Sequence, residues 1–521
     1  MKKIEEKSLC INKKNSFNRF EKICYCGFSL IVIVLYYLNF KIFKNDIFIM
    51  HKKIYTLVYF IISILITFII YYLINYCLKN KNKEIYRIFF VITFILGNIY
   101  SLLTPLFAGS DEEYHFYRIY EIASGNLITP KIKENVYGSN MPMSIELIKG
   151  NKGNYTKYID TVKSFNLSLE KNKTMSFGNY YGTTSIYPFV QYLPQSIIVA
   201  LARILNLKPT LIAYIARYSG FIFWLFMCTY AIKIIPCKKN FLFLLLISPA
   251  SISFATVMSG DTVTNACIIV FISYIYKLIN DNKILKIKDY IIIFILSIMI
   301  SMCKLVFLPI IGLGLLVNKE LFGGIKKKYI IGIILVLTVL VFSLGWLAIS
   351  SRYMSSSNKT FLQKEWIKYN PVMFLFVIIR TYLNNFVVYI QEIVAGNQLY
   401  HSQLNVPSFI NFGYFVTLIL GLFSEDNKIK FKNIDKIWIV NLLFLIVLLI
   451  STALYIQCTA WNKGIGYPYI DGIQGRYFIP VVMLLLFINN KKIDVKKEQL
   501  IITNILLTLP IYILMLTTFM F

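Results

Sequence analysis

The stretch IYTLVYFIISILITFIIYYLINYCL, residues 54–78, decides the class of fold, because it is predominantly apolar and holds no charged side chain. An apolar run of about 20 residues crosses the hydrocarbon core of a bilayer once as an α-helix. The whole 521-residue chain has this character, since 57% of its residues are hydrophobic and 15% are charged. A soluble domain could not bury so much apolar surface, so the sequence predicts an all-α polytopic membrane protein.

Apolar runs on either side of this stretch predict about 13 membrane-spanning helices in all. The clearest of them lie near residues 24–43, 88–107, 211–235, 241–258, 262–280, 329–350, 437–457 and 500–521. The run 290–318 is too long for one span and holds Lys304 and Pro309 at its middle, so we expect two short helices there. The runs 408–423 and 477–490 predict shorter spans.

The lysines predict how the chain is oriented, because cytoplasmic loops are enriched in Lys and Arg. Two apolar segments with several polar residues, 186–206 and 372–394, could either span or lie flat. If both lie in the outer interface as amphipathic helices, the later basic clusters all fall on the side of the basic N-terminus. These clusters are 238–239, 283–288, 319–328, 428–436 and 491–497. The prediction is therefore a cytoplasmic N-terminus and one long outer loop at 108–210, with the lysines of 44–53 as the exception.

The positive charge of the chain fits membrane lipids as partners better than nucleic acid. There are 54 Lys and Arg against 25 Asp and Glu, which gives a formal net charge of +29. These charges form short clusters between apolar runs, where they act as topology signals and contact anionic lipids. No nucleic-acid partner is expected. The nine cysteines have no spacing that indicates disulfides, and the histidines at 51, 115 and 401 are too scattered to suggest a zinc cluster.

The most informative polar stretch is GSDEEYHFYRIYEIASGNLITP, residues 109–130, which follows the span that ends near residue 107. Ser110 or Asp111 can cap a helix there, and the consecutive acids suit the positive end of its dipole. Helical spacing puts Asp111, His115 and Arg118 on one face, so that a carboxylate, an imidazole and a guanidinium project together at the membrane surface. The alternative is a solvated, well-capped helix without a chemical role.

Three further polar features stand in apolar surroundings. Asp261 begins a predicted span in SPASISFATVMSGDTVTNA, residues 248–266, where it could simply cap the helix. Lys304 interrupts the run 290–318, where snorkelling to the outer surface is the alternative to a functional role. The segment YPYIDGIQGRYFIP, at 467–480, carries Gln474 and Arg476, which could be interfacial anchors only.

The predicted topology brings all four features to the outer side, although none of them was used to derive it. Carboxylates can act as a general base or hold a divalent cation, and Arg and Lys bind phosphate. A divalent cation is therefore one cofactor that such a site could take. The combination suits transfer of a group from a phosphate-bearing lipid. The glycines at 312–324 form no phosphate-binding loop, because they lack the strand and the Lys-Ser/Thr pair that such a loop needs.

At these same residues the chain resembles a bacterial membrane-protein family catalogued as domain of unknown function 2142. The resemblance rests on five motifs in order: DEEYHFYRIYEIASGNL at 111–127, YPFVQYLPQSIIVALARIL at 187–205, SPASISFATVMSGDTVTNA at 248–266, CKLVFLP at 303–309 and GRYFIP at 475–480. It departs at Gly109 and Ser110, where prolines would be expected. A core at 88–490 is thus predicted, with a basic segment and extra hairpin at 1–87 and a basic loop and last span at 491–521.

That family is similar to the GT-C glycosyltransferases, polytopic enzymes that use polyprenyl-phosphate-linked sugars on the extracytoplasmic side. The resemblance implies an essential acid in the first large outer loop and a second acid in a later outer turn. Asp111 matches the first acid, with Glu112 beside it, and Asp261 matches the second. The resemblance also implies that 186–206 is a juxtamembrane helix, which agrees with the lysine distribution.

The hypothesis from the sequence is an inverting glycosyltransferase of the bacterial cytoplasmic membrane with an extracytoplasmic active site. Its donor would be a polyprenyl-phosphate-linked sugar, and its acceptor an envelope glycan, lipid or protein. Asp111 is expected to deprotonate the acceptor hydroxyl, with Glu112 as its catalytic neighbour. The expected substrate-binding residues are His115, Arg118, Asp261, Lys304, Gln474 and Arg476. A transporter or flippase of an envelope glycolipid, or a polysaccharide polymerase, is the alternative.

Overall fold

The computed structural model describes residues 19–43, 52–133, 136–149, 158–169, 174–176, 182–281, 283–353, 358–395, 404–425, 431–488 and 492–520. Nine helices within these residues are long and apolar enough to cross a membrane. They are α2 (Arg19–Phe43), α3 (Lys52–Lys79), α4 (Ile85–Leu103), α10 (Pro209–Ile234), α13 (Gly260–Asn280), α15 (Ile325–Ser350), α17 (Pro371–Val394), α19 (Asn433–Leu454) and α21 (Lys497–Met520). The predicted fold class, an all-α polytopic membrane protein, is confirmed.

Shorter helices form the other predicted spans. They are α11 (Lys239–Leu246), α12 (Pro249–Ala255), α14 (Ile287–Cys303), η3 (Leu305–Leu316), α18 (Ser408–Phe423), η7 (Gly475–Phe478) and η8 (Val481–Phe487). The break between α11 and α12 falls at Pro249, where the Ser248 side chain caps the new helix by accepting from the Ser251 N–H. Pro lacks the N–H that a continuing helix needs, so the chain restarts there. The predicted division of 290–318 is confirmed, because α14 ends beside Lys304 and η3 begins directly after it.

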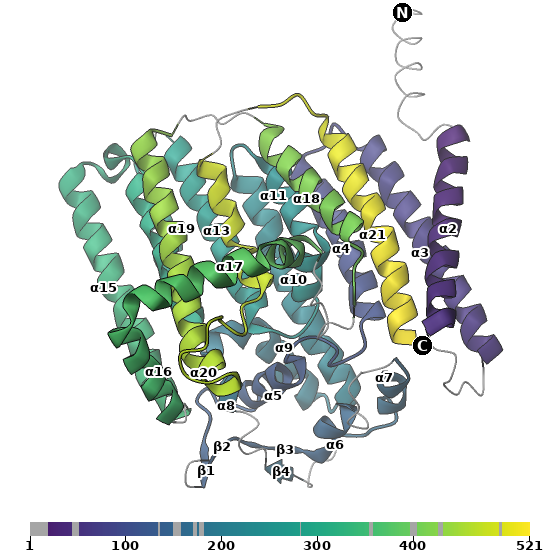
Figure 1. Cartoon of the computed structure of the whole chain (residues 1–521), viewed down its shortest axis with the longest axis horizontal. Helices are drawn as coiled ribbons and strands as arrows, with labels where there is room; N and C mark the ends of the chain where they lie inside the picture. The colour runs from purple at the N-terminus through teal and green to yellow at the C-terminus, as the bar shows by residue number, and fades with distance from the viewer. Residues whose placement is uncertain are drawn as a thin grey trace, which may run out of the picture.

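The segment between α4 and α10 lies at one end of the bundle, which we call the loop end (Figure 1). It holds α5 (Glu112–Ala123), α6 (Met143–Glu146), η1 (Leu147–Lys149), α7 (Tyr158–Ser164), α8 (Gly182–Ser185), η2 (Phe189–Tyr192) and α9 (Leu193–Ile204). Two small antiparallel pairs accompany these helices, β1 (Lys131–Lys133) with β2 (Val136–Tyr137) and β3 (Asn140–Pro142) with β4 (Thr174–Ser176). The 12-residue α9 is too short to cross a membrane.

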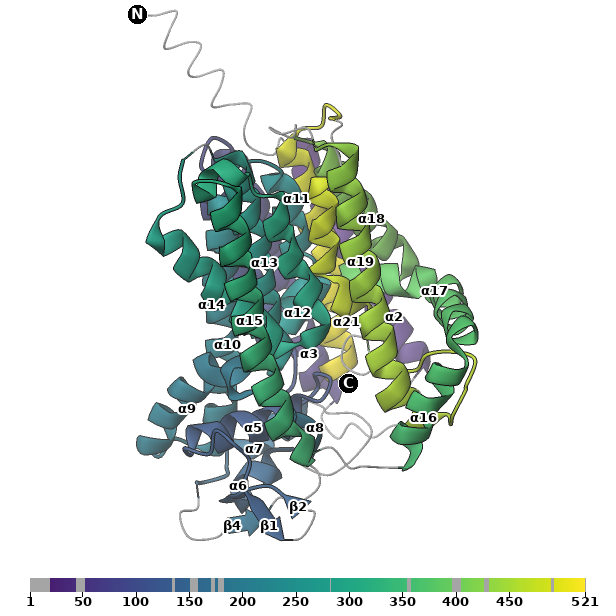
Figure 2. The same ribbon diagram turned by 90° about the vertical axis from the view of Figure 1, so that its left-hand side faces the viewer.

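The opposite end of the bundle, which we call the lysine end, carries the basic first turns of several long helices. Lys326 of α15, Lys436 of α19 and Lys497 of α21 lie on these turns. Figures 1 and 2 show the starts of all three helices away from α5 and α9. These basic first turns lie at the end of the bundle opposite to the long loop, as the predicted sidedness requires. Which end faces the cytoplasm stays a prediction.

Helix α17 was predicted to lie flat in the outer interface. By length and composition alone it could cross a membrane. Figure 1 shows it running obliquely in front of α13 and α19, whereas those two helices run along the axis of the bundle. It follows α16 (Asn358–Tyr369) at the loop end. The placement of 372–394 in the interface therefore stays a prediction.

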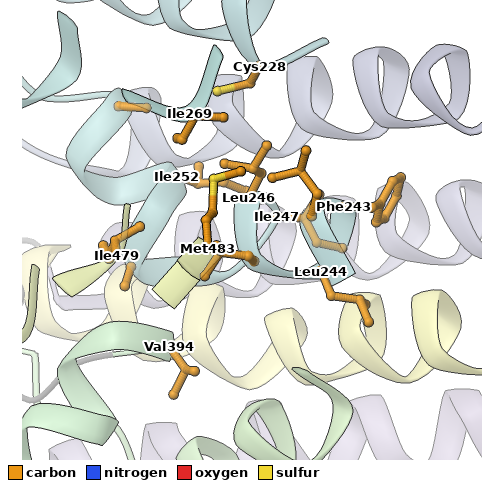
Figure 3. Close-up of a cluster of buried hydrophobic side chains, with 14 of the residues drawn as sticks. Cys228, Phe243, Leu244, Leu246, Ile247, Ile252, Ile269, Val394, Ile479 and Met483 are labelled. Atoms are coloured by element: carbon orange, nitrogen blue, oxygen red, sulfur yellow. The ribbon is translucent and has the colours of Figure 1, made fainter. Parts of the chain in front are cut away.

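The core surrounds α13 and the broken helix α11–α12. Of the apolar window of α13, 83% is buried, the highest share among the long helices of the described residues. Figure 3 shows Leu246, Ile247 and Ile252 of the broken helix beside Met483 of η8. Helices approach closely where glycine leaves room, since a Cβ at Gly421 would meet Leu244 at 2.5 Å. This packing holds the ends of α13, α14 and η7 in fixed positions at the loop end.

The extra N-terminal hairpin consists of α2 and α3, and it joins the bundle through α21. α21 packs against α2, α3 and α4, whereas α2 and α3 share far fewer contacts with each other. The Tyr512 hydroxyl donates to the Leu96 carbonyl of α4 at 3.1 Å, and Thr517 donates to the Tyr59 hydroxyl of α3 at 3.3 Å. Figure 1 shows α21 between the hairpin and the remaining bundle.

Candidate functional site

Three charged side chains from distant parts of the chain meet at the loop end. Asp261 stands in the first turn of α13, Lys304 follows the last turn of α14, and Arg476 belongs to η7. One Asp261 carboxylate oxygen forms an ion pair with the Lys304 ammonium, and the other lies 3.8 Å from Arg476 Nε. Their side chains are between 12% and 16% exposed, so the group borders the surface without being solvated freely. We call these three residues the charged triad.

The start of α13 leaves the Asp261 carboxylate free to face the two cations. Ser259, not Asp261, caps the helix, because its hydroxyl accepts from the Asp261 N–H at 3.1 Å. Gly260 is required by close packing, since a Cβ there would meet Gln191 Oε1 at 2.7 Å. Capping of the helix by Asp261 was one possibility from the sequence. In the structure Ser259 caps α13 instead.

Aromatic rings hold the two cations of the triad. The Lys304 ammonium lies 4.8 Å from the centre of the Tyr477 ring. The Arg476 guanidinium lies 5.4 Å from the Phe254 ring and 5.5 Å from the Tyr477 ring. Ring faces attract cations, which compensates part of the hydration that both groups lose. The triad has one more positive than negative charge, so it is suited to an anion.

His115 of α5 lies beside the triad in a neutral form. Its Nδ1 is 2.7 Å from the Tyr192 hydroxyl, and its ring packs near Tyr187. Burial lowers the pKa of His115 to about 4, although the charges of Asp261 and Asp111 act in the opposite direction. The imidazole is thus uncharged at neutral pH and can accept or donate a hydrogen bond without adding charge to the site.

Asp111 occupies the N-cap position of α5, and its carboxylate is exposed. Its φ of 58° is left-handed, a region that Asp tolerates better than most residues. The predicted capping by its side chain is not found, because the carboxylate makes no cap hydrogen bond. The charge of Asp111 acts on His115 and on Arg476, so the structure brings these three predicted residues into one electrostatic neighbourhood.

Glu112 points away from the triad, although it is adjacent to Asp111. Its two carboxylate oxygens accept from Nε and Nη2 of Arg217 at 2.9 and 2.8 Å, and neither side chain is exposed. The same carboxylate accepts from the backbone N–H groups of Gly109 and Met258 at 3.1 and 3.0 Å. Glu112 therefore joins the start of α5 to α10 and to the segment before Asp261. Arg217 was not predicted, although an arginine within the apolar run 211–235 was the available signal.

Arg118 does not join the triad either. Its guanidinium pairs with Glu121 at 2.5 Å and donates to the Thr129 hydroxyl and to the Leu127 carbonyl at 3.1 and 2.7 Å. The chain turns back after α5 ends at Ala123, which brings these partners over the arginine. Asp111, His115 and Arg118 were expected to share one face. In the structure Asp111 and His115 lie near the triad, whereas Arg118 does not.

Residues around the triad fix its geometry. Gln191 Nε2 donates to the Thr264 hydroxyl of α13 at 3.1 Å and to the Cys303 carbonyl of α14 at 2.6 Å. These partners neighbour Asp261 and Lys304 in the chain, so η2 sets the distance between the two helix ends. The sequence predicted no role for Gln191, because its partners are distant along the chain.

Helix α17 fixes the position of the first residue of η7. The Gly475 N–H donates to the Glu392 carboxylate of α17, and a Cβ at Gly475 would meet the Tyr389 carbonyl at 2.5 Å. Gln474, which was predicted to bind substrate, is half-buried directly before this glycine. It stands two residues from Arg476 at the same side of the bundle.

The residues present do not fit a divalent cation at the triad. Among the residues that the structure describes, no group of three or more His, Cys, Asp or Glu could hold a metal ion. The Asp261 carboxylate faces two cationic side chains, which would repel a metal. His51 and His401 lie outside the described residues.

Comparison with known proteins identifies the family of the chain. No curated protein and no solved structure matches it. A family model with the description "Predicted membrane protein (DUF2142)" matches residues 94–485, which include the charged triad, Asp111 and His115. Because the match covers most of the chain, this protein belongs to the DUF2142 family of membrane proteins.

Proposed function

We propose that this membrane protein is a glycosyltransferase that takes a sugar from a polyprenyl-phosphate-linked donor on the extracytoplasmic side. The acceptor is an envelope glycan, lipid or protein. The observation that carries the proposal is the charged triad at the loop end, with an exposed carboxylate and a neutral imidazole beside it. A net positive group at the rim of an apolar bundle suits the phosphate of a lipid whose chain lies among the helices.

In the proposed reaction, Lys304 and Arg476 bind the donor phosphate, and Asp261 keeps both cations in place. Asp111 removes the proton from an acceptor hydroxyl, and the oxygen attacks the anomeric carbon of the sugar. The bond between that carbon and the phosphate oxygen breaks, and its electron pair leaves with the lipid phosphate. The two cations stabilise the charge that develops on this leaving group. The configuration at the anomeric carbon is inverted.

Asp111 is a better candidate for the base than Asp261 or Glu112. Asp261 is paired with Lys304, and Glu112 is fully buried against Arg217, so neither carboxylate is available to an acceptor. Asp111 is exposed and makes no side-chain cap bond. His115 is a positioning residue in this proposal, because its ring is hydrogen-bonded to Tyr192 and lies within the electrostatic reach of Asp111 and Asp261.

The test is an Asp111→Asn variant in isolated membranes, supplied with a panel of polyprenyl-phosphate-linked hexoses. Release of free polyprenyl phosphate is measured, since this product does not depend on the identity of the acceptor. We expect a loss of at least about 100-fold, the usual contribution of a general base. Glu365→Gln is the control, because that acid of α16 is only loosely paired with Lys368 at 3.8 Å.

Equal amounts of both variants in the membrane are required for the comparison. If Asp111→Asn released polyprenyl phosphate as fast as the unchanged protein, Asp111 would not be the base. If the unchanged protein released none from any donor, while the lipid moved across the bilayer, the chain would be a transporter instead.

A further inference from the structure

A cavity of about 480 Å³ lies beside α14 and η3, toward the lysine end of the bundle. It is bounded by α14, η3 and α15 and by the second half of α13. Its walls are almost entirely apolar, as Phe271, Ile293, Phe294 and Leu308 illustrate. Volumes of several hundred Å³ are typical of ligand pockets. The proposed glycosyltransferase function assigns nothing to this space.

Two glycines keep the cavity open. A Cβ built at Gly314 of η3 or at Gly332 of α15 would meet no atom within 4 Å, and both glycines line the cavity. The η3 segment is a 3₁₀-helix over 12 residues, with Pro309 inside it. A 3₁₀-helix is thinner than an α-helix, so it leaves more space against its neighbours. The cavity thus follows from the local sequence.

The cavity opens to the outer surface of the bundle. Leu315, Ile333 and Leu337 line it, and they are 52%, 60% and 57% exposed. Ile333 and Leu337 belong to α15, one of the helices that can cross a membrane, and only 22% of the apolar window of α15 is buried. An exposed apolar surface on such a helix faces the hydrocarbon of the bilayer. An alkyl chain can therefore enter from the side.

Three consecutive lysines of α15 lie at the lysine end of this cavity, and one of them lines it. Lys328 lines it and donates from Nζ to the carbonyls of Leu315 and Val317 at 2.8 and 2.6 Å. Lys326 and Lys327 are exposed in the same turn of α15. Among the described residues, neither of these two lysines forms an ion pair. Exposed Glu320 of η4 (Lys319–Phe322) is the acid nearest in sequence to this cluster.

We propose that this cavity binds one acyl chain of an anionic phospholipid, whose phosphate contacts the lysines of α15. The apolar walls and the lateral opening suit an alkyl chain, and the cluster of Lys326, Lys327 and Lys328 suits a negative headgroup. Basic groups next to a membrane-spanning helix attract anionic lipids, and each contributes separately to the attraction. This site is independent of the proposed glycosyltransferase reaction.

The test uses the full chain in phosphatidylcholine vesicles with a minor fraction of phosphatidylglycerol that carries a diazirine on one acyl chain. After illumination, the labelled peptides are identified by mass spectrometry. We expect label on η3 and on the first half of α15. A Gly332→Leu variant fills the cavity and should lower this label about tenfold. Gly345→Leu is the matched control, because Gly345 lies on the same helix in open space but does not line the cavity.

The headgroup is tested with a Lys326→Gln/Lys327→Gln variant and with the same diazirine chain on phosphatidylcholine. Both changes should weaken labelling, whereas Lys364→Gln, at an exposed lysine of α16, should not. If Gly332→Leu does not fold, judged by its elution in gel filtration, Gly314→Leu takes its place.

Three results would overturn the proposal. If labelling is unchanged in the Gly332→Leu variant, the acyl chain does not bind in the cavity. If phosphatidylcholine labels the protein as strongly as phosphatidylglycerol, the lysines do not select an anionic headgroup. Competition by unlabelled polyprenyl phosphate but not by phosphatidylglycerol would assign the cavity to an isoprenoid lipid instead.

Discussion

Arg476 shows how a charged side chain can be held at the rim of an apolar bundle. The guanidinium contacts the rings of both Phe254 and Tyr477 and faces the carboxylate of Asp261. Its Nε is buried and makes no hydrogen bond to the described residues. In the part of the chain that the structure describes, its one ion-pair partner, Asp261, is 3.8 Å away, so this N–H can still donate to a bound anion, which is the role that the proposed function gives to this residue.

At the scale of single residues, His115 predicts a pH dependence of stability. Burial lowers its pKa to about 4, from about 6.5 in an unfolded chain. Between these values the unfolded chain binds a proton that the folded chain does not, so stability falls as the pH drops through this window. Above about 6.5 both states are neutral and the contribution is constant. The loss at low pH should reach about 3 kcal/mol at most.

The measurement is the thermal unfolding midpoint of the purified protein, followed from neutral pH to about pH 4.5. Carboxylates also begin to titrate near the lower limit, so the comparison is with a His115→Gln variant, which lacks the imidazole. We expect the midpoint of the unchanged protein to fall more steeply. Parallel curves would show that His115 is not buried in its neutral form.

Single residues of the site differed in how well they could be predicted from the sequence. Asp261, Lys304 and Arg476 could be predicted as site residues, because charged side chains are rare in apolar surroundings. Arg118 could not be placed, because its surroundings depend on how the chain turns after α5. Gln191 carries no charge, and its partners lie more than 70 residues away.

At the scale of elements, the buried pair of Glu112 and Arg217 joins α5 to α10. Arg217 also donates to the carbonyls of Ser101, Thr104 and Pro105 at 3.2, 2.8 and 3.0 Å, which closes the end of α4. Removing one partner of such a pair leaves a buried charge without compensation, which costs about 3–5 kcal/mol. The start of α5, and Asp111 with it, should then lose its fixed position.

We therefore expect Arg217→Met to lower the thermal unfolding midpoint strongly, with little folded protein at elevated temperature. Glu113→Gln is the control, because the half-buried Glu113 accepts from the Tyr117 hydroxyl and a Gln side chain can still accept this bond. A midpoint of Arg217→Met equal to that of the control would show that the pair does not support the loop.

Most elements could be predicted, and the exceptions have physical causes. Apolar runs of sufficient length predicted α3 and α10 nearly to their ends, and α2 and α19 with starts a few residues too late. The division of α11 from α12 was missed, because Pro249 can also stand in a continuous kinked helix. The course of α17 is set by its contacts with η7 and α18, which no local pattern contains.

At the scale of the whole molecule, the charges of the two ends predict the sidedness of the protein. Ser124 is exposed at the loop end, and Lys283 is exposed before α14 at the lysine end. A cysteine at each position reports the side on which it lies. The background variant replaces the native cysteines that are outside the described residues or at least partly exposed, Cys10, Cys24, Cys26 and Cys458.

In intact cells, a membrane-impermeant maleimide should modify Ser124→Cys at once. It should modify Lys283→Cys only after the membrane is permeabilised, because cytoplasmic loops carry the lysines. The opposite pattern would place the charged triad in the cytoplasm. An extracytoplasmic transferase would then be excluded.

The position of α21 between the N-terminal hairpin and the bundle bears on biogenesis. The ribosome makes α2 and α3 long before α21, the helix against which both pack. The hairpin must therefore wait in the bilayer, incompletely assembled, until α21 has been made. A nascent chain that stops early would leave it without its neighbour, exposed to membrane proteases.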